Sequence, residues 1–377
     1  MPDLHIHTLS FRGGLHIGTR GVNLEEGGVH LPSDTLFAAV LDAWRRSGGD
    51  VDAFAMPFAC DPPDPPFLLT SAFPFAGDVR FYPMPVDLAR VLSGEKLEGA
   101  GKVAKRIRYL SEGLLRRALG GAMLDAELFP ADPDQEPTTG LALQGGAFWL
   151  LREEADGLPP GLHPSKGKLR ALRFLDVTAM DKTPRVTVDR ISSASTIYHA
   201  GRVSFAEGCG LWFGVAWRDR ARCIGVGGPA FPEALGAALH MLAEDGIGGE
   251  RAAGYGAFDL KRLEEPTSLP DPTPGVPAWL LSRYCPRADE LPGALSAEGA
   301  AYRLTAVAGW MHSPDGASQR RKRVYLADEG SLVCPAAYPG GRLADVRPTY
   351  ASGAGQAPHP VYRYGLALAA GWRESHG

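Results

Sequence analysis

The chain has 377 residues, of which 45% are hydrophobic and 22% charged, and its formal net charge is −4. This length predicts two domains, and the composition is that of a globular protein without any apolar run long enough to cross a bilayer. The first residues lack the pattern of a signal peptide, and five scattered cysteines without a CxxC pair disfavour a disulfide framework or a cysteine zinc site. We therefore expect a cytoplasmic protein without membrane contact, in which any nucleic-acid surface is a local patch.

The N-terminal part predicts a strand, a helix and two further strands. Residues 4–11 alternate as in a strand, and 33–46 place apolar side chains at helical spacing, with Ser33 or Asp34 as the N-cap. Residues 67–75 and 78–85 are typical of two strands joined by a turn. Histidines in the first strand are candidate metal ligands, but no carboxylate cluster or HExxH motif accompanies them, and neither a metal nor another cofactor is expected.

Two basic segments follow. Residues 102–121 predict a basic amphipathic helix or a pair of helices, which is either a solvated face or a surface for RNA or an acidic partner. Residues 183–205 contain two strand patterns around a serine-rich tip and predict a protruding β-hairpin. Basic residues interleaved with aromatic ones suit phosphate contact and base stacking. The candidates on this hairpin are Arg185, Arg190, Tyr198 and Arg202.

A glycine-rich run, GIGGERAAGYGAF over 246–258, follows a predicted strand at 209–219 and a helix that ends at Gly246. Glycine permits positive φ and lets backbone N–H groups approach a phosphate closely, while Arg251 adds a forked cationic donor. Glu250 would repel a phosphate and is expected to point away from it, and Tyr255 is a candidate stacking platform. A strand is predicted over 255–260.

A proline-rich segment at 264–277 marks the predicted boundary between an N-terminal domain, 1–263, and a C-terminal domain, 278–377. The second domain is expected to be mostly β, with strand patterns at 278–285 and 302–313, a basic strand, turn and strand at 320–333, and a last pattern at 359–372. Catalytic motifs are missing: there is no GxxxxGK[ST] and no GxSxG. The run 225–230 matches GxGxxA, but Pro229 removes an N–H that a dinucleotide would need.

The order of these segments resembles the RAMP superfamily of CRISPR-associated RNA-binding proteins. The resemblance is carried by FRGGLHIG (11–18), SDTLFAAV (33–40), TPRVTVDRIS (183–192), GGERAAGYGAF (248–258), LLSRYCP (280–286), RKRVYLADEGS (321–331) and HPVYRYGLAL (359–368). Together these segments are similar to the fourth Csm subunit of type III-A effector complexes over nearly the whole chain. The insert at 125–170 is the part that is hard to align.

This resemblance implies an α+β fold of two ferredoxin-like (RRM-like) domains with a β-hairpin thumb at about 183–205. It implies a non-catalytic subunit that caps the 5′ handle of crRNA in antiviral and anti-plasmid defence. The implied partners are the large polymerase-like subunit, the first backbone RAMP subunit and the end of the guide–target duplex. The family's handle-binding loop corresponds here to Gly248, Gly249, Arg251, Gly254 and Gly256.

His16 and Tyr255 complete the RNA-binding candidates, together with the four hairpin residues named above. Two other functions stay open at this point. One is a RAMP endoribonuclease that processes precursor crRNA with His16 as general base. The other is a nucleotide-binding enzyme that uses the segment around Gly225.

Overall fold

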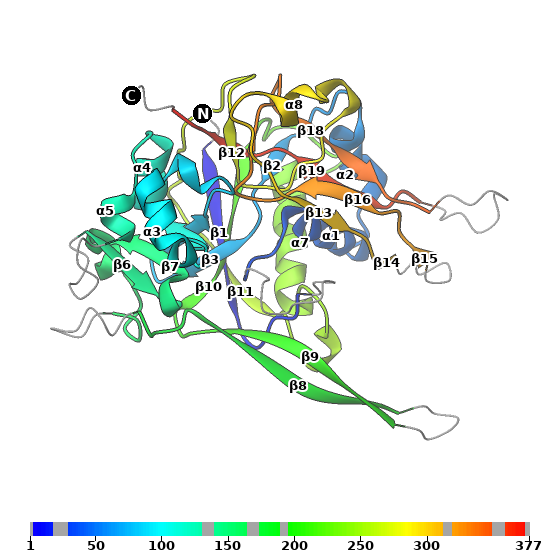
Figure 1. Cartoon of the computed structure of the whole chain (residues 1–377). Coiled ribbons are helices and arrows are strands. Elements are labelled where there is room, and N and C mark those ends of the chain that lie inside the picture. Colours follow the sequence, from blue (N-terminus) through cyan, green and yellow to red (C-terminus); the bar gives the residue numbers. More distant parts are fainter. Residues whose placement is uncertain are drawn as a thin grey trace.

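The computed structural model describes residues 3–17, 29–129, 139–163, 173–188, 195–311, 319–348 and 359–373, with the backbone alone at 182–185, 187–188, 196–200 and 311. This part of the chain has a mixed α+β fold built around one large sheet (Figure 1). None of its helices combines the length and the apolar character that crossing a bilayer requires.

The large sheet has nine strands. Eight follow the order β11-β1-β10-β3-β4-β5-β7-β6, and β2 pairs with β10 next to β3. Every neighbouring pair is antiparallel except β5 and β7, which are parallel. The strands are β1 (Leu4–Phe11), β2 (Phe67–Leu69), β3 (Phe73–Ala76), β4 (Val79–Pro83), β5 (Tyr109–Ser111), β6 (Gly140–Leu143), β7 (Phe148–Leu151), β10 (Cys209–Trp217) and β11 (Phe258–Arg262).

Two helical connections shape one end of this sheet. The chain passes from β1 through α1 (Ser33–Arg46) and α2 (Val51–Ala59) to β2 and β3, and from β10 through α7 (Phe231–Asp245) to β11. Each connection skips one strand, so the order β11-β1-β10-β3 is that of a βαββαβ unit. Helices α1 and α7 lie side by side (Figure 1). The other helices among the described residues of this half are η1 (Leu88–Arg90), α3 (Gly94–Ala104), α4 (Glu112–Leu119), α5 (Asp125–Leu128), η2 (Gln144–Gly146), η3 (Arg152–Gly157) and η4 (Arg251–Ala253).

Helix α1 forms where its apolar spacing predicts, but its first turn differs from the prediction. Pro32 is the N-cap residue and no side chain caps the helix, while Ser33 and Asp34 are buried. The backbone N–H of Arg283 donates to Ser33 Oγ at 2.9 Å, and Arg363 donates to Asp34 Oδ2 at 3.1 Å. The predicted cap is therefore wrong, because both side chains bond to the C-terminal half of the chain.

The basic segment 102–121 contains two helices, as one form of the prediction had it, but a strand separates them. Helix α3 ends inside the segment, β5 joins the sheet, and α4 follows. The guanidinium of Arg116 donates twice to Glu112, at 2.7 and 3.1 Å, and Arg117 donates to Glu127 at 2.6 Å. Much of the positive charge on α4 is thus compensated within the chain.

A long β-hairpin projects from the body of the molecule (Figure 1). It consists of β8 (Thr178–Val188) and β9 (Ser195–Phe205), paired antiparallel from Thr178 opposite Phe205 to Val188 opposite Ser195. The prediction placed a hairpin at about 183–205, and the observed one begins five residues earlier, at 178. The alternation predicted its existence, whereas its full length depends on pairing across the two strands.

The C-terminal half consists of small sheets. In the described residues these are the three-stranded sheet β17-β12-β20 and the pairs β13-β16, β14-β15 and β18-β19. Their strands are β12 (Ala278–Leu280), β13 (Leu304–Val307), β14 (Trp310–Met311), β15 (Gln319–Arg320), β16 (Val324–Ala327), β17 (Leu332–Val333), β18 (Gly341–Asp345), β19 (Tyr362–Leu366) and β20 (Ala369–Gly371). Two short helices, η5 (Ala288–Glu290) and α8 (Gly293–Ser296), lie between β12 and β13. A second ferredoxin-like domain stays a prediction.

The two halves share one hydrophobic core. Trp279, Leu281 and Tyr364 belong to the same buried cluster as the side chains of the large sheet. The proline-rich segment 264–277 packs along both halves, because Thr267 pairs with Leu4 and the N–H of Gly371 donates to the Pro270 carbonyl at 2.8 Å. The division into domains at this segment stays a prediction.

Candidate nucleic-acid interface

The glycine-rich run lies between the end of α7 and the start of β11. Its glycines with positive φ are Gly246 (80°), Gly248 (93°), Gly254 (81°) and Gly256 (83°). A Cβ on Gly256 would lie 2.1 Å from the carbonyl oxygen of Ile247, so the loop closes on itself too tightly for any larger residue. The strand predicted from 255 begins at Phe258, because this turn continues through Gly256.

Most glycine N–H groups of this loop already have acceptors inside the protein. The acceptors are the carbonyls of Leu242 for Gly246 (2.8 Å), His16 for Gly249 (2.9 Å), Arg251 for Gly254 (2.9 Å) and Gly14 for Gly256 (2.9 Å). The expected cradle of bare donors is therefore largely occupied, and these glycines shape the loop. Contact with RNA at Gly248, Gly249, Gly254 and Gly256 stays a prediction.

Residues 14–16 connect the glycine-rich loop to the base of the hairpin. Leu15 exchanges two backbone hydrogen bonds with Val203 in β9, at 2.7 and 2.8 Å, and the His16 carbonyl accepts the N–H of Gly249. The ring of His16 forms a further hydrogen bond from Nδ1 to the Gly201 carbonyl. A short ladder thus runs from the loop through residues 14–16 to β9, and it brings His16 next to Gly249.

Arg202 and Tyr255 meet across this ladder. The guanidinium carbon of Arg202 lies 5.8 Å from the centre of the Tyr255 ring, within the range of a cation–π contact. Gly14 makes room for this contact, since a Cβ there would lie 2.5 Å from the side chain of Arg202. The predicted stacking platform at Tyr255 therefore carries a cation over its ring, which adds positive charge where a base would stack.

Arg251 lies at the surface of the loop, in the short helix η4. Among the described residues its guanidinium has no hydrogen-bond or ion-pair partner, whereas its backbone carbonyl accepts the N–H of Gly254. Glu250 precedes it with φ of 58°, and both line a shallow surface cavity with Asp245 and Arg46, which form an ion pair with each other. That Glu250 points away from bound RNA stays a prediction.

Comparison with known proteins finds similarity to Csm4 proteins. Residues 275–372 match the family described as the CRISPR Csm4 C-terminal domain. The protein Csm4 of Mycobacterium tuberculosis (strain H37Rv) is 26% identical over 356 residues, which is 94% of this chain and 93% of that protein. The Csm4 of Thermococcus onnurineus (strain NA1) is 25% identical over 80% of this chain and 81% of its own length. The chain is Csm4-like.

Solved structures agree with the fold of this Csm4-like chain. A chain in the crystal structure of the Csm3–Csm4 subcomplex of the type III-A CRISPR-Cas interference complex superposes with a TM-score of 0.61 at 14% identity, covering 98% of this chain and 99% of that one. A chain of the Csm1–Csm4 cassette in complex with pppApA gives a TM-score of 0.53 at 18% identity over the full length of both. At these identities the likeness concerns the fold.

The hairpin candidates lie away from the loop of this Csm4-like chain. Arg185 in β8 and Tyr198 in β9 are paired directly opposite each other in the register of the hairpin, and only their backbone is described. Arg190 lies outside the described residues. Of the hairpin residues predicted from the sequence, Arg202 is thus the one that the structure brings to the glycine-rich loop.

Two of the sequence alternatives meet structural obstacles. The strand before Gly225 is β10, whose partners β1, β2 and β3 are all antiparallel to it, whereas a dinucleotide fold places parallel strands side by side. In β1, the ring of His7 is buried and stacks on Phe213. The described residues contain no group of three or more metal-ligating side chains arranged around a common point.

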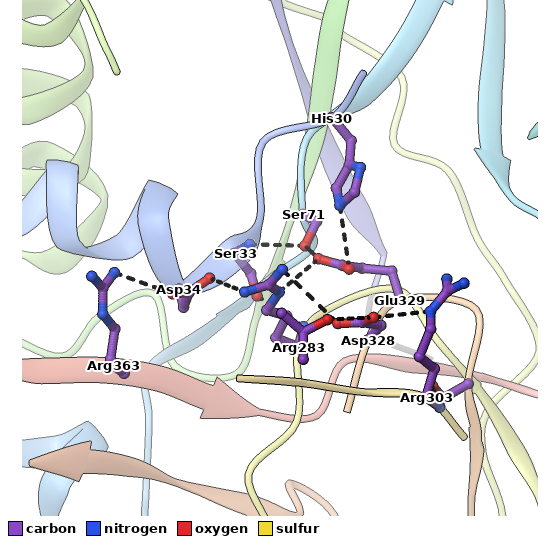
Figure 2. A network of polar contacts seen from close by, with 11 residues as sticks. His30, Ser33, Asp34, Ser71, Arg283, Arg303, Asp328, Glu329 and Arg363 are labelled. Atoms are coloured by element: carbon purple, nitrogen blue, oxygen red, sulfur yellow. Dashed lines mark hydrogen bonds and ion pairs between the residues drawn. The ribbon is translucent and has the colours of Figure 1, made fainter. Parts of the chain in front are cut away.

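A buried polar network between the halves is the feature that the sequence did not reveal (Figure 2). Asp34 binds both Arg283, at 3.4 Å, and Arg363, at 3.1 Å. Glu329 accepts a hydrogen bond from Ser71 Oγ, and its carboxylate lies 3.4 Å from His30. Its charged residues lie in different kinds of element, with Asp34 in α1, Arg363 in β19 and Glu329 in the turn after β16. No local pattern in the sequence marks them, because Asp34 and Arg363 are 329 residues apart.

The pKa values of two carboxyl groups in this network, Glu329 and Asp328, are shifted in opposite directions. Burial acts to raise the pKa of Glu329, but the charges of His30 and Arg283 and the hydrogen bond from Ser71 outweigh it and hold the pKa well below its ordinary value. Burial and the neighbouring Glu329 raise the pKa of Asp328. The network therefore favours a charged Glu329 as the partner of Arg283.

Proposed function

We propose that the chain is a non-catalytic, RNA-binding subunit of a type III-A CRISPR effector complex that caps the 5′ handle of crRNA in defence against viruses and plasmids. The observation that carries this proposal is the ladder through residues 14–16, which joins the glycine-rich loop to the base of the β8–β9 hairpin. In this proposal Arg251, Tyr255 and Arg202 act together as one RNA-binding surface.

The chemistry of this surface suits an RNA backbone with unpaired bases. Arg251 is exposed and its guanidinium presents a fork of donors that matches a phosphate. Tyr255 supplies an aromatic ring, and Arg202 places a cation over one face of that ring. The β8–β9 hairpin then acts as the thumb at the end of the guide–target duplex, with Arg185, Arg190 and Tyr198 as its contacts.

The partners are proposed by extension from the relatives. Csm4 was crystallised with Csm3 and with Csm1, and we assign this chain a backbone RAMP subunit and a large polymerase-like subunit in the same way. We interpret the βαββαβ unit within residues 1–263 as a ferredoxin-like domain and residues 278–377 as a second one, connected by 264–277. Copurification of the chain with both subunits tests this assignment.

Replacement of Arg251 by alanine tests the handle contact. In the assembled complex we expect weaker binding of an RNA carrying the handle, and a salt dependence that is flatter by about 0.7 in the log–log slope, because one phosphate contact is lost. Arg152, an exposed arginine in η3, provides the matched control, and R152A should leave both quantities unchanged. Equal affinity and equal slope in R251A and the wild type would contradict the proposal.

Incubation with repeat RNA tests the non-catalytic part of the proposal. His16 is the general base of the rival endoribonuclease, and its Nδ1 already bonds to Gly201, so Nε2 is the nitrogen left for proton transfer. We expect no cleavage by the purified chain. Cleavage that disappears in H16A would replace our proposal by the endoribonuclease.

A further inference from the structure

A second hairpin in the C-terminal half has one face packed and one face open. Strands β13 and β14 run antiparallel to β16 and β15, from Leu304 opposite Ala327 to Met311 opposite Gln319. We call residues 304–311 and 319–327 the C-terminal hairpin. Its inner face packs against a small buried cluster through Val307 and Val324. Exposure alternates along the first strand, so residues 304, 306, 308 and 310 form the outer face.

The outer face of the C-terminal hairpin exposes large apolar and aromatic side chains. Leu304 is 45% exposed, Trp310 47% and Tyr325 54%. All seven tryptophans lie in the described part of the chain, and among them Trp310 alone is exposed. Tyr325 lies opposite Ala306, which is exposed, and Trp310 follows on the same strand after residues 308–309, where the pairing register shifts by one residue. Exposed aromatic rings in a row are costly in water unless a partner covers them.

The same hairpin is strongly basic. Arg320, Lys322 and Arg323 are exposed, and none forms an ion pair with a described residue. No acidic residue occurs in 302–311 or 319–327, although the whole chain has a net charge of −4. Arg320 lies directly opposite Trp310, so a cation and an aromatic ring are neighbours on one face. Within these two ranges the positive charge has no carboxylate in the same segment, and Asp315, between them, lies outside the described residues.

We propose that the outer face of the C-terminal hairpin binds single-stranded RNA, with unpaired bases stacked on Trp310 and Tyr325 and phosphates held by Arg320 and Arg323. Stacking is sequence-tolerant, because every base has an aromatic face, and the arginines follow the backbone. The site is separate from the glycine-rich loop, and this inference goes beyond the proposed function and does not depend on it.

The combination of charge and aromatic residues favours a single strand over the other partners. A duplex keeps its bases stacked internally, which leaves Trp310 and Tyr325 without a partner. A protein interface is usually depleted of lysine at its centre, and this face would require an acidic partner to cover its cations. An unpaired RNA strand satisfies both the rings and the charges.

The experiment uses the purified full-length chain and the assembled complex. Fluorescence anisotropy with a labelled oligouridylate, at several salt concentrations, compares the wild type with W310A/Y325A, R320A/R323A and W310F, and with R152A as the control for charge. We expect W310A/Y325A to bind about tenfold more weakly or worse and W310F to stay close to the wild type, because phenylalanine still stacks. R320A/R323A should flatten the salt dependence by about 1.4, or two phosphates' worth, while R152A changes neither quantity.

Ultraviolet cross-linking of the assembled complex to its own RNA provides the second measurement. Cross-linked peptides from 302–311 or 319–327 would support the proposal, and a thermal melt of each variant shows that it is folded. Unchanged affinity in both double variants, with no cross-link in these peptides, would overturn it. So would a loss of another protein subunit from W310A/Y325A at unchanged RNA affinity, since the face would then be a protein interface.

Discussion

Glycines of this chain differ in what a methyl group would meet. At Gly236, inside α7, the space is open and the backbone is helical, whereas Gly254 has open space but a φ of 81°. At Gly256 a positive φ combines with a carbonyl 2.1 Å from the ideal Cβ. Replacing each of these glycines by alanine therefore tests a different effect: helix propensity at Gly236, backbone strain at Gly254, and strain together with steric overlap at Gly256.

Alanine should raise the free energy of unfolding at position 236, lower it at 254, and lower it further at 256. We expect G236A to stabilise the protein by roughly 0.5–1 kcal/mol, G254A to destabilise it by about 1 kcal/mol, and G256A by more than about 2 kcal/mol. Urea denaturation of the three variants measures the differences. A G256A protein as stable as G254A would mean that the loop closes differently from the arrangement described above.

At the scale of single elements, helix α4 shows that a basic segment need not bind RNA, because its arginines form ion pairs within the chain. Arg116 donates twice to Glu112 on the same helix, four residues earlier, and both ends of this pair reach solvent. Such an i, i+4 pair contributes about 0.5 kcal/mol. We therefore expect R116A to lower stability by about that amount and to leave the RNA affinity of the assembled complex unchanged. A loss of affinity comparable to that of R251A would make α4 part of the RNA surface.

Local patterns predict the elements, and long-range partners decide their details. The apolar spacing of 33–46 predicts α1 because periodicity is a local property. The fate of Asp34 depends on Arg363, 329 residues away, and the donors of the glycine-rich loop depend on Gly14 and His16. A single sequence does not contain these pairings. This is why the helix and the loop are found, whereas the predicted cap is wrong and most of the loop donors that we expected to be bare have acceptors inside the protein.

At the scale of the whole molecule, Glu329 links stability to pH. Its folded pKa is lowered, so its contribution is fully present above the unfolded value of about 4.5 and is lost as the pH falls below it. The raised pKa of Asp328 acts in the opposite sense, because its protonation favours the folded state. The acid sensitivity of the protein is the difference between the two effects.

Replacement of Glu329 by glutamine should destabilise the protein at neutral pH and reduce its sensitivity to acid. We expect a loss of about 3 kcal/mol or more, because Arg283 and His30 lose a buried charged partner. Urea titrations at neutral pH and at several values below about pH 4.5 measure both effects. E98Q, at an exposed glutamate in α3, is the control, and an unchanged pH profile in E329Q would refute the assignment.

The bond between Asp34 and Arg363 also has a consequence for biosynthesis. A ribosome completes α1 long before it adds β19, and until then Asp34 has no Arg363 and Phe37 has no Tyr364 ring against it. An emerging N-terminal half would thus present an unpaired carboxylate beside a bare apolar stripe. The apolar face of α1 is therefore covered only after β19 has been synthesised, because Arg363 follows Asp34 by 329 residues. A product truncated before β19 would be prone to aggregation and proteolysis.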